Sequence, residues 1–128
     1  MPSVNQVSDL IENPENFEDE QRFKMTIIAL ISPIIEINEK NFSLYAKVFN
    51  TNLNIEENEF ISLKKLLAKD NRSTDEKIDY IKKELGNNVY QIMQFLKILN
   101  RIIIVNGCKQ KSYFQFENIR DTFLKEFY

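Results

Sequence analysis

The sequence predicts an all-α fold, a small bundle of about six helices, with a C-terminal β-hairpin as the alternative near its end. Only two Gly and three Pro occur among 128 residues, and so few interruptions favour long helices over many short strands. Apolar residues make up 43% of the chain and charged residues 28%, a balance typical of a globular domain with one hydrophobic core.

The chain divides into a polar, acidic leader, residues 1–20, and a single helical domain, residues 21–128. The leader contains the helix-breaking run Asn13-Pro14-Glu15-Asn16. We therefore expect it to be flexible or only loosely docked on the domain.

The first predicted helix runs from Gln21 to about Glu36, because its apolar residues recur every three or four positions. Pro33 lies inside this run and either kinks the helix or starts a separate turn, since its ring removes a backbone donor. Asn38 or Asn41 is then a candidate cap for a short helix that carries Phe42, Tyr45, Ala46 and Phe49.

Residues 50–54 are predicted to form a loop, followed by an amphipathic helix over residues 56–69. Its acidic residues lie in the first turn and its lysines near the end, as the helix dipole favours. Ser73 and Glu76 have the spacing of a capping box for the next helix, and Gly86 is a natural residue to end it. Asn88 opens a strongly apolar helix that continues to Ile102, and we predict that this is the central helix of the bundle.

The stretch from residue 102 to residue 116 has two interpretations. The β-branched run Ile102–Val105 followed by Asn106-Gly107 predicts a β-hairpin, with residues 108–116 as the returning strand. Alternatively the central helix continues to Val105, and a final helix begins at a capping box formed by Ser112 and Gln115. The second interpretation is favoured because one helical face then collects Tyr113, Phe116, Ile119, Phe123 and Phe127.

The residue types exclude several kinds of chemistry within this chain. There is no His, so catalysis by an imidazole base and metal binding by imidazole are both excluded. Cys108 is the one Cys, so no internal disulfide or thiolate cluster can form, and no Gly-rich loop is present to hold a phosphate. We expect a non-enzymatic protein without cofactor or metal.

The cellular location expected from the sequence is the cytoplasm. No basic start followed by an apolar run marks a signal peptide, and a single Cys suits a reducing compartment. The most apolar segment, residues 27–37, is far shorter than the roughly 20 residues that cross a bilayer, so no membrane is expected as a partner.

Charge is distributed unevenly along the chain. Residues 1–60 hold 11 acidic and 4 basic side chains, a net charge of −7, whereas residues 61–128 hold 8 acidic and 13 basic ones, a net charge of +5. The favoured interpretation is that the two halves pack with complementary charges or carry simple solvated faces. The alternative is a basic surface that faces an acidic partner.

Two segments share a helix–loop–helix pattern, residues 52–59 and residues 106–115. Over roughly residues 40–127 the chain resembles the TerB-like family of helical domains, which is associated with tellurite resistance and related stress or defence systems. The family's recurring element is Asp-Gly-x-Ile-Ser-x-x-Glu, and Asn52, Ile55 and Glu59 match its spacing, with Leu53 in the Gly position. The second segment matches through Asn106-Gly107 and Gln115 if two residues are inserted.

The resemblance implies an interaction or adaptor module of a bacterial or phage-related stress or defence system, with a protein partner encoded nearby. Acidic loop residues are candidate cation ligands in the family. Here Asn52 replaces an Asp and Gln115 replaces a Glu, so we expect no metal, and Glu59 and Gln115 are expected to cap helices instead.

The hairpin interpretation leads to the alternative function, a winged-helix protein that binds nucleic acid or an SMC-type partner. Lysines at the wing tip would then contact phosphates, although the pI of about 5.3 and an apolar recognition helix make nucleic acid the less favoured partner. The terminal aromatic residues exceed one helical face, so Phe114 and Tyr128 are candidate anchors, with core filling as the favoured alternative. The candidate partner-binding residues are Arg101, Asn106, Lys109, Lys111, Phe114 and Tyr128.

Overall fold

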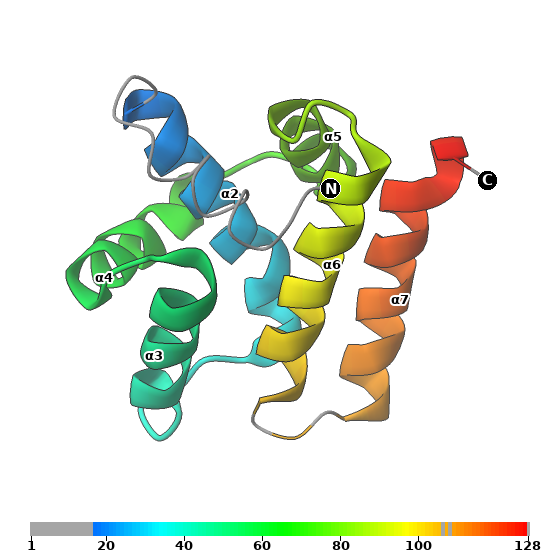
Figure 1. Ribbon diagram of the computed structural model, residues 1–128. Helices are drawn as coiled ribbons and strands as arrows, with labels where there is room; N and C mark the ends of the chain where they lie inside the picture. Colours follow the sequence, from blue (N-terminus) through cyan, green and yellow to red (C-terminus); the bar gives the residue numbers. More distant parts are fainter. Residues whose placement is uncertain (1–16, 106, 108, 128) are drawn as a thin grey trace.

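The computed structural model describes residues 17–105, 107 and 109–127, and these residues form six α-helices and two short 3-10 helices (Figure 1). In chain order the elements are α2 (Phe17–Ile35), α3 (Phe42–Leu53), α4 (Glu57–Leu66), η2 (Leu67–Lys69), α5 (Thr74–Glu84), α6 (Val89–Ile104), α7 (Gln110–Leu124) and η3 (Lys125–Phe127). No strand occurs in this described part, so the predicted all-α bundle is confirmed.

The predicted alternative, a hairpin over residues 102–116, is wrong. Residues up to Ile104 belong to α6, and α7 begins at Gln110 after a short turn in which Gly107 has a φ of +75°. The β-branched run stays helical because Ile102 and Ile103 are buried in the core, so tertiary packing outweighs their strand propensity.

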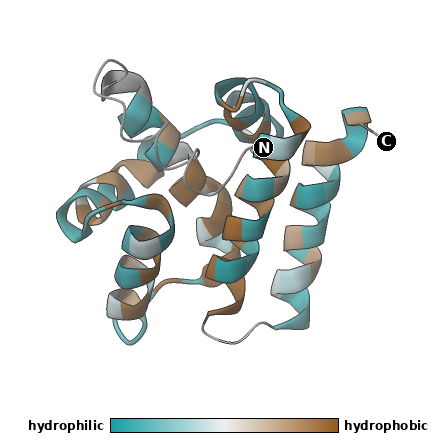
Figure 2. Cartoon of the chain, in the orientation of Figure 1, coloured by the Kyte–Doolittle hydropathy of each residue, from teal (hydrophilic) through white to brown (hydrophobic). Residues whose placement is uncertain are grey.

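The central helix of the bundle is α2, not α6 as predicted. Five consecutive α2 residues, 27–31, are all buried, so every side of the helix is covered there. They are covered because α2 packs against α4, α5, α6 and α7. In contrast, α6 keeps one side open to solvent, where Met93, Lys97 and Arg101 are exposed. Figure 2 shows hydrophilic and hydrophobic segments alternating along α6 and α7, as expected of helices with one buried face.

Aromatic rings connect the helices at two places in the core. Phe95 of α6 lies between Phe23 of α2 and Phe123 of α7, with ring centroids 6.4 Å and 5.7 Å away. Phe60 of α4 contacts Phe42 and Phe49 of α3 at 5.5 Å and 5.0 Å. These contacts place α3 and α4 at one flank of the bundle and α6 and α7 at the other (Figure 1).

Several predicted helix boundaries are confirmed. The capping box is formed, since the Ser73 hydroxyl accepts a hydrogen bond from the Glu76 amide and the Glu76 carboxylate accepts one from the Ser73 amide. Asn88 caps α6 by accepting from two amides of its first turn. Gly86, at φ +69°, directly follows the C-cap of α5, where a residue without Cβ adopts the left-handed conformation at little cost.

Other boundaries differ from the prediction. Helix α2 begins at Phe17, inside the predicted leader, while residues 1–16 lie outside the described part. Pro33 is accommodated inside α2, two residues before its end. Helix α3 covers most of the predicted 50–54 loop, because Leu53 is fully buried and only Asn54 turns to a left-handed φ of 55°.

The N-terminus of α7 also differs. Ser112 is not a cap, because α7 already begins at Gln110 with Lys109 as its N-cap residue. The Ser112 hydroxyl instead donates a hydrogen bond of 3.1 Å to the Ile34 carbonyl at the end of α2. Asn41, a predicted cap for α3, occupies the N-cap position, but its side chain bonds to residues 36 and 38.

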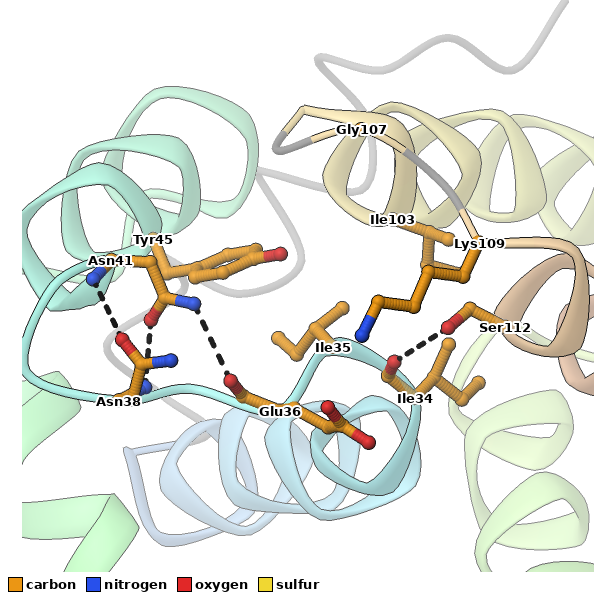
Figure 3. A pocket seen from close by; sticks show the side chains of 10 residues that line it. All are labelled: Ile34, Ile35, Glu36, Asn38, Asn41, Tyr45, Ile103, Gly107, Lys109 and Ser112. Atoms are coloured by element: carbon orange, nitrogen blue, oxygen red, sulfur yellow. Dashed lines mark hydrogen bonds between the residues drawn. The ribbon is translucent and has the colours of Figure 1, made fainter.

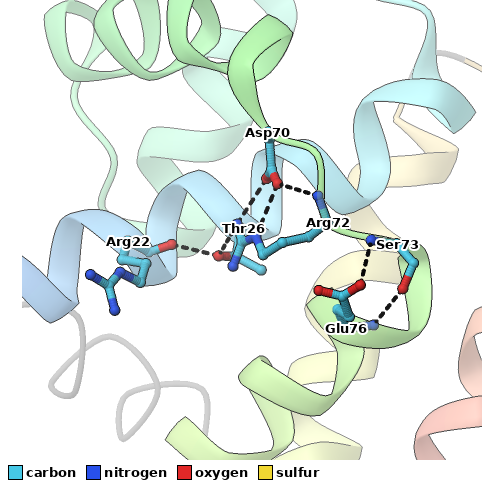
Figure 4. A network of polar contacts seen from close by, with 6 residues as sticks. All are labelled: Arg22, Thr26, Asp70, Arg72, Ser73 and Glu76. Atoms are coloured by element: carbon cyan, nitrogen blue, oxygen red, sulfur yellow. Dashed lines mark hydrogen bonds and ion pairs between the residues drawn. The ribbon is translucent and has the colours of Figure 1, made fainter.

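A partly buried polar network connects the segment before α5 to α2 (Figure 4). The Arg72 guanidinium donates two hydrogen bonds to the Asp70 carboxylate, at 2.8 Å and 3.0 Å, and one of 2.9 Å to the Thr26 hydroxyl. Thr26 is fully buried on α2 and donates its own proton to the Arg22 carbonyl. Because the polar atoms satisfy one another, these hydrogen bonds help to hold the turn into α5 against α2.

Candidate functional site

Exposed large apolar side chains are concentrated on one flank of the bundle. Two of them, Ile61 and Leu66, lie on α4. The other six lie on α6, on α7 or directly after α6, and they are Tyr90, Met93, Ile104, Val105, Tyr113 and Phe114. Such a concentration is typical of a surface that binds another molecule.

A groove between α6 and α7, with a volume of about 350 Å³, runs through this flank. We call it the α6–α7 groove, and its lining residues are Met93, Leu96, Lys97, Asn100, Arg101, Tyr113, Phe116, Arg120 and Leu124. The α6 members follow one another at helical spacing, as do the α7 members, so each set shares one face of its helix. The groove is therefore formed where these two faces of the antiparallel helices α6 and α7 lie side by side.

The middle of the groove is apolar and its margins are basic. Leu96 and Phe116 are buried at its base, and both belong to the hydrophobic core. Lys97, Arg101 and Arg120 also line it, and no Asp or Glu does so among the described residues. Arg120 has neighbouring carboxylates, Asp121 at 3.2 Å and Glu117 at 3.8 Å.

Lys97 and Arg101 differ from Arg120 in this respect. Within the described part of the chain, no carboxylate lies within 4.0 Å of either cation. The α6 margin is therefore the more positive side of the groove.

The ion pairs described elsewhere in the bundle each join two residues from the same half of the sequence. They do not pair the basic second half with the acidic first half. Lys24 pairs with Glu20 and Glu59, which lie in the same half of the sequence. Likewise Lys82 pairs with Glu126 within the second half. The basic margin of the groove is thus not neutralised by these contacts.

A second, smaller cavity lies where the end of α2, the start of α3 and the turn before α7 meet (Figure 3). Its volume of about 140 Å³ suits a few water molecules rather than an organic substrate. Its polar groups bond to one another: the Asn41 side-chain oxygen Oδ1 accepts from the Asn38 backbone amide at 2.7 Å, and the Ser112 hydroxyl donates to the Ile34 carbonyl. Figure 3 shows the Lys109 side chain extending along this cavity. We assign it no catalytic role.

The residues that match the TerB-like element have structural contacts. Ile55 is fully buried, and the Asn52 amide donates to the Val48 carbonyl within α3. Glu59 was expected to cap α4, but both of its carboxylate oxygens accept from the buried Lys24 ammonium, at 2.9 Å and 3.1 Å. Gln115 lies beyond the first turn of α7 and is not at a capping position. Among the described residues, no group of three or more Asp, Glu, Cys or His is placed to hold a metal ion.

The four predicted partner-binding residues that the structure describes lie near the turn between α6 and α7. Arg101 lines the groove, and Phe114 lies on α7 with 60% of its surface exposed. Lys109 lines the small cavity instead, and Lys111 is exposed in the first turn of α7. Asn106 and Tyr128 lie outside the described residues.

Sequence reasoning missed the most informative groove residues. Tyr113 was expected to face the core, but it is exposed and lines the groove. Met93 and Arg120 were not singled out. The i, i+4, i+8 spacing of Met93, Lys97 and Arg101 places all three on one helix face, and that signal could have identified the α6 side.

In comparisons with known proteins, no family model, curated protein or solved structure matches the chain. Of the helices that the structure describes, none has the length and apolar character that crossing a bilayer requires.

Proposed function

We propose that this domain is a non-enzymatic protein-interaction module that binds its partner through the α6–α7 groove. The observation that supports the proposal is the coincidence, on one flank, of exposed apolar and aromatic side chains with Arg101 and Lys97 around an apolar base. Aromatic residues, Met and Arg are the residue types enriched in protein interfaces. Exposure of these apolar side chains to water is unfavourable. A partner that covers them would therefore be bound with a favourable free energy.

The biological setting of this module is a second part of the proposal. The resemblance to the TerB-like family supports a role in a bacterial or phage-related stress or defence system, with a partner encoded nearby. The single Cys of the sequence supports a cytoplasmic location.

Nucleic acid is the less favoured partner. The winged-helix alternative needed a β-hairpin near residues 102–116, and that segment contains the end of α6 and the start of α7 instead. Without a wing, Lys109 and Lys111 lie beside the turn before α7 rather than at the tip of a strand pair. A phosphate backbone would also gain little from the apolar base of the groove.

Site-specific photo-cross-linking in the source cell tests the proposal. A benzophenone amino acid is placed at Met93 or Tyr113 in the groove, and at Ile61 or Leu66 on α4 as matched controls. All four residues are between 36% and 43% exposed, so accessibility alone does not separate them. The expected result is an adduct to one discrete protein from the two groove positions only.

Two results would contradict the proposal. Adducts of equal yield from α4 would show that contact is not specific to the groove. Cross-linking of the groove positions to nucleic acid, abolished by high salt, would identify the alternative partner class.

A further inference from the structure

We infer that the partner presents an acidic amphipathic α-helix, which lies lengthwise in the groove between α6 and α7. The inference deepens the proposed function and rests on it. It follows from the groove's shape, from the order of its apolar and basic side chains, and from the absence of a sheet edge among the described elements.

The shape of the groove matches a helix. Its α6 margin runs from Met93 to Arg101 and its α7 margin from Tyr113 to Leu124, which correspond to roughly 12 Å and 16 Å of helix axis. A ligand helix of about three turns covers that length. A third helix on two antiparallel neighbours also repeats the packing by which side-chain ridges fill grooves between helices.

The backbone of the groove disfavours an extended peptide. Peptides that bind as strands obtain most of their affinity from hydrogen bonds to an exposed sheet edge. Here both walls are helices whose backbone groups are already bonded within α6 and α7, so only side chains are offered. A ligand that satisfies its own backbone, as a helix does, avoids burying unpaired peptide groups.

The apolar order of the groove defines the buried face of the ligand. Leu96 and Phe116 form the base, with Met93 and Leu124 towards one end and Tyr113 towards the other. Ligand residues at i, i+3 or i+4, and i+7 would lie along this line.

The charges define the flanks of the ligand. Lys97 and Arg101 are four residues apart on α6, which places their side chains roughly 6 Å apart on one face. Two carboxylates one turn apart on a ligand helix match this spacing. On the opposite margin, Arg120 already has Asp121 and Glu117 as neighbours. The acidic flank of the ligand therefore faces α6.

A direct test uses a synthetic helical peptide of about 16 residues with Leu on one face and Glu residues one turn apart along one flank, and a matched peptide in which Lys replaces every Glu. Binding to the full chain is measured by fluorescence anisotropy. We expect the Glu peptide to bind and the Lys peptide to bind at least about tenfold more weakly, because like charges repel at the margin.

Charge reversal then separates recognition from a fold defect. The double variant Lys97→Glu with Arg101→Glu should lose about tenfold in affinity for the Glu peptide and gain affinity for the Lys peptide. An unfolded variant would bind neither peptide specifically, so this exchange of preference requires an intact groove. Lys65 is an exposed residue of α4, away from the groove. Lys65→Glu is therefore the matched control and should leave the affinities for both peptides unchanged.

Equal binding of the two peptides, or binding that the double reversal leaves unaltered, would overturn the inference. So would chemical-shift changes that map to Ile61 and Leu66 instead of the groove, or self-association through the groove that Arg101→Glu abolishes. If cross-links from Met93 and Tyr113 identify a partner while the Glu peptide does not bind, the inference of an acidic helical ligand is wrong, but the proposal of an interaction module is retained.

Discussion

The Lys82 ammonium lies 3.3 Å from the Glu126 carboxylate, and this ion pair connects α5 to the last turn that the structure describes. The two side chains have very different surroundings, since Lys82 is 3% exposed and Glu126 is 62% exposed. The ammonium also lies 5.7 Å from the centroid of the Phe127 ring. A buried cation is thus neutralised by a carboxylate that remains in water.

Removing the carboxylate should therefore cost more than removing the cation. Glu126→Ala leaves the Lys82 ammonium buried without its partner, and we expect the free energy of unfolding to fall by about 1 kcal/mol, because the exposed carboxylate is partly screened. Lys82→Met keeps the volume of the side chain and removes its charge, and should change stability by less than about 0.5 kcal/mol. Urea unfolding followed by circular dichroism measures both. A larger loss for Lys82→Met would contradict the assigned asymmetry.

The Asp70–Arg72 contact predicts a pH dependence of stability. Hydrogen bonds from the Arg72 guanidinium lower the pKa of Asp70 from 3.8 to about 2, and the Asp70 side chain is 4% exposed. Because folding favours the ionised form, this stabilisation is complete above about pH 4 and is lost as the pH falls towards about 2. At pH 7, Asp70→Asn should lower the free energy of unfolding by about 1 to 2 kcal/mol.

The measurement is urea unfolding of the wild type and Asp70→Asn between about pH 7 and pH 2. The difference between the two proteins should shrink as the pH falls. Asp79→Asn, at an exposed position of α5, is the control and should show a much smaller difference. A gap between wild type and Asp70→Asn that stays constant with pH would exclude the proposed linkage.

The capping box of α5 offers a local test of helix stability. Ser73→Ala removes the hydroxyl that accepts from the Glu76 amide and leaves that amide without its partner, so we expect a loss of about 1 kcal/mol. Ser62→Ala serves as the comparison, because Ser62 is exposed inside α4, where Ala is a good helix former. Thermal and urea unfolding should show Ser73→Ala as the less stable protein.

Truncation of two phenylalanines should change stability by very different amounts. Phe95 is fully buried between Phe23 and Phe123, and Phe95→Ala should destabilise the fold by about 3 to 5 kcal/mol through the cavity it creates. Phe114 is mostly exposed, so Phe114→Ala should change stability by less than about 0.5 kcal/mol. A substantial loss for Phe114→Ala would show that this ring contributes to folding and not only to the surface.

The helical class and several helix ends could be predicted because their causes are local. Ser73, Glu76 and Asn88 satisfy the first amides of the helices that follow them, and this requires only neighbouring residues. The local pattern at residues 102–116 fits a hairpin almost as well as a helix. There the deciding contacts were those of Ile102 and Ile103 with the core, which no local pattern contains.

The predictions are wrong where a contact with a residue far away in the sequence determines the role of a side chain. Ser112 has the spacing of a cap but bonds to Ile34, which is 78 residues away. Glu59 has the spacing of a cap but binds Lys24 on another helix. Predicting the groove requires knowing which face of α7 packs against α6. The sequence pattern does not contain this information, so it assigns Tyr113 to the core, whereas Tyr113 lines the groove.

The complete burial of residues 27–31 in α2 has a consequence for synthesis on the ribosome. This segment emerges before any of the four helices that pack against it, and α7 is translated nearly eighty residues after it. During that interval its isoleucines stay open to wrong contacts, and a chain released before α7 is made lacks one wall of its own core. Truncated products of this protein should consequently be recognised by chaperones through α2.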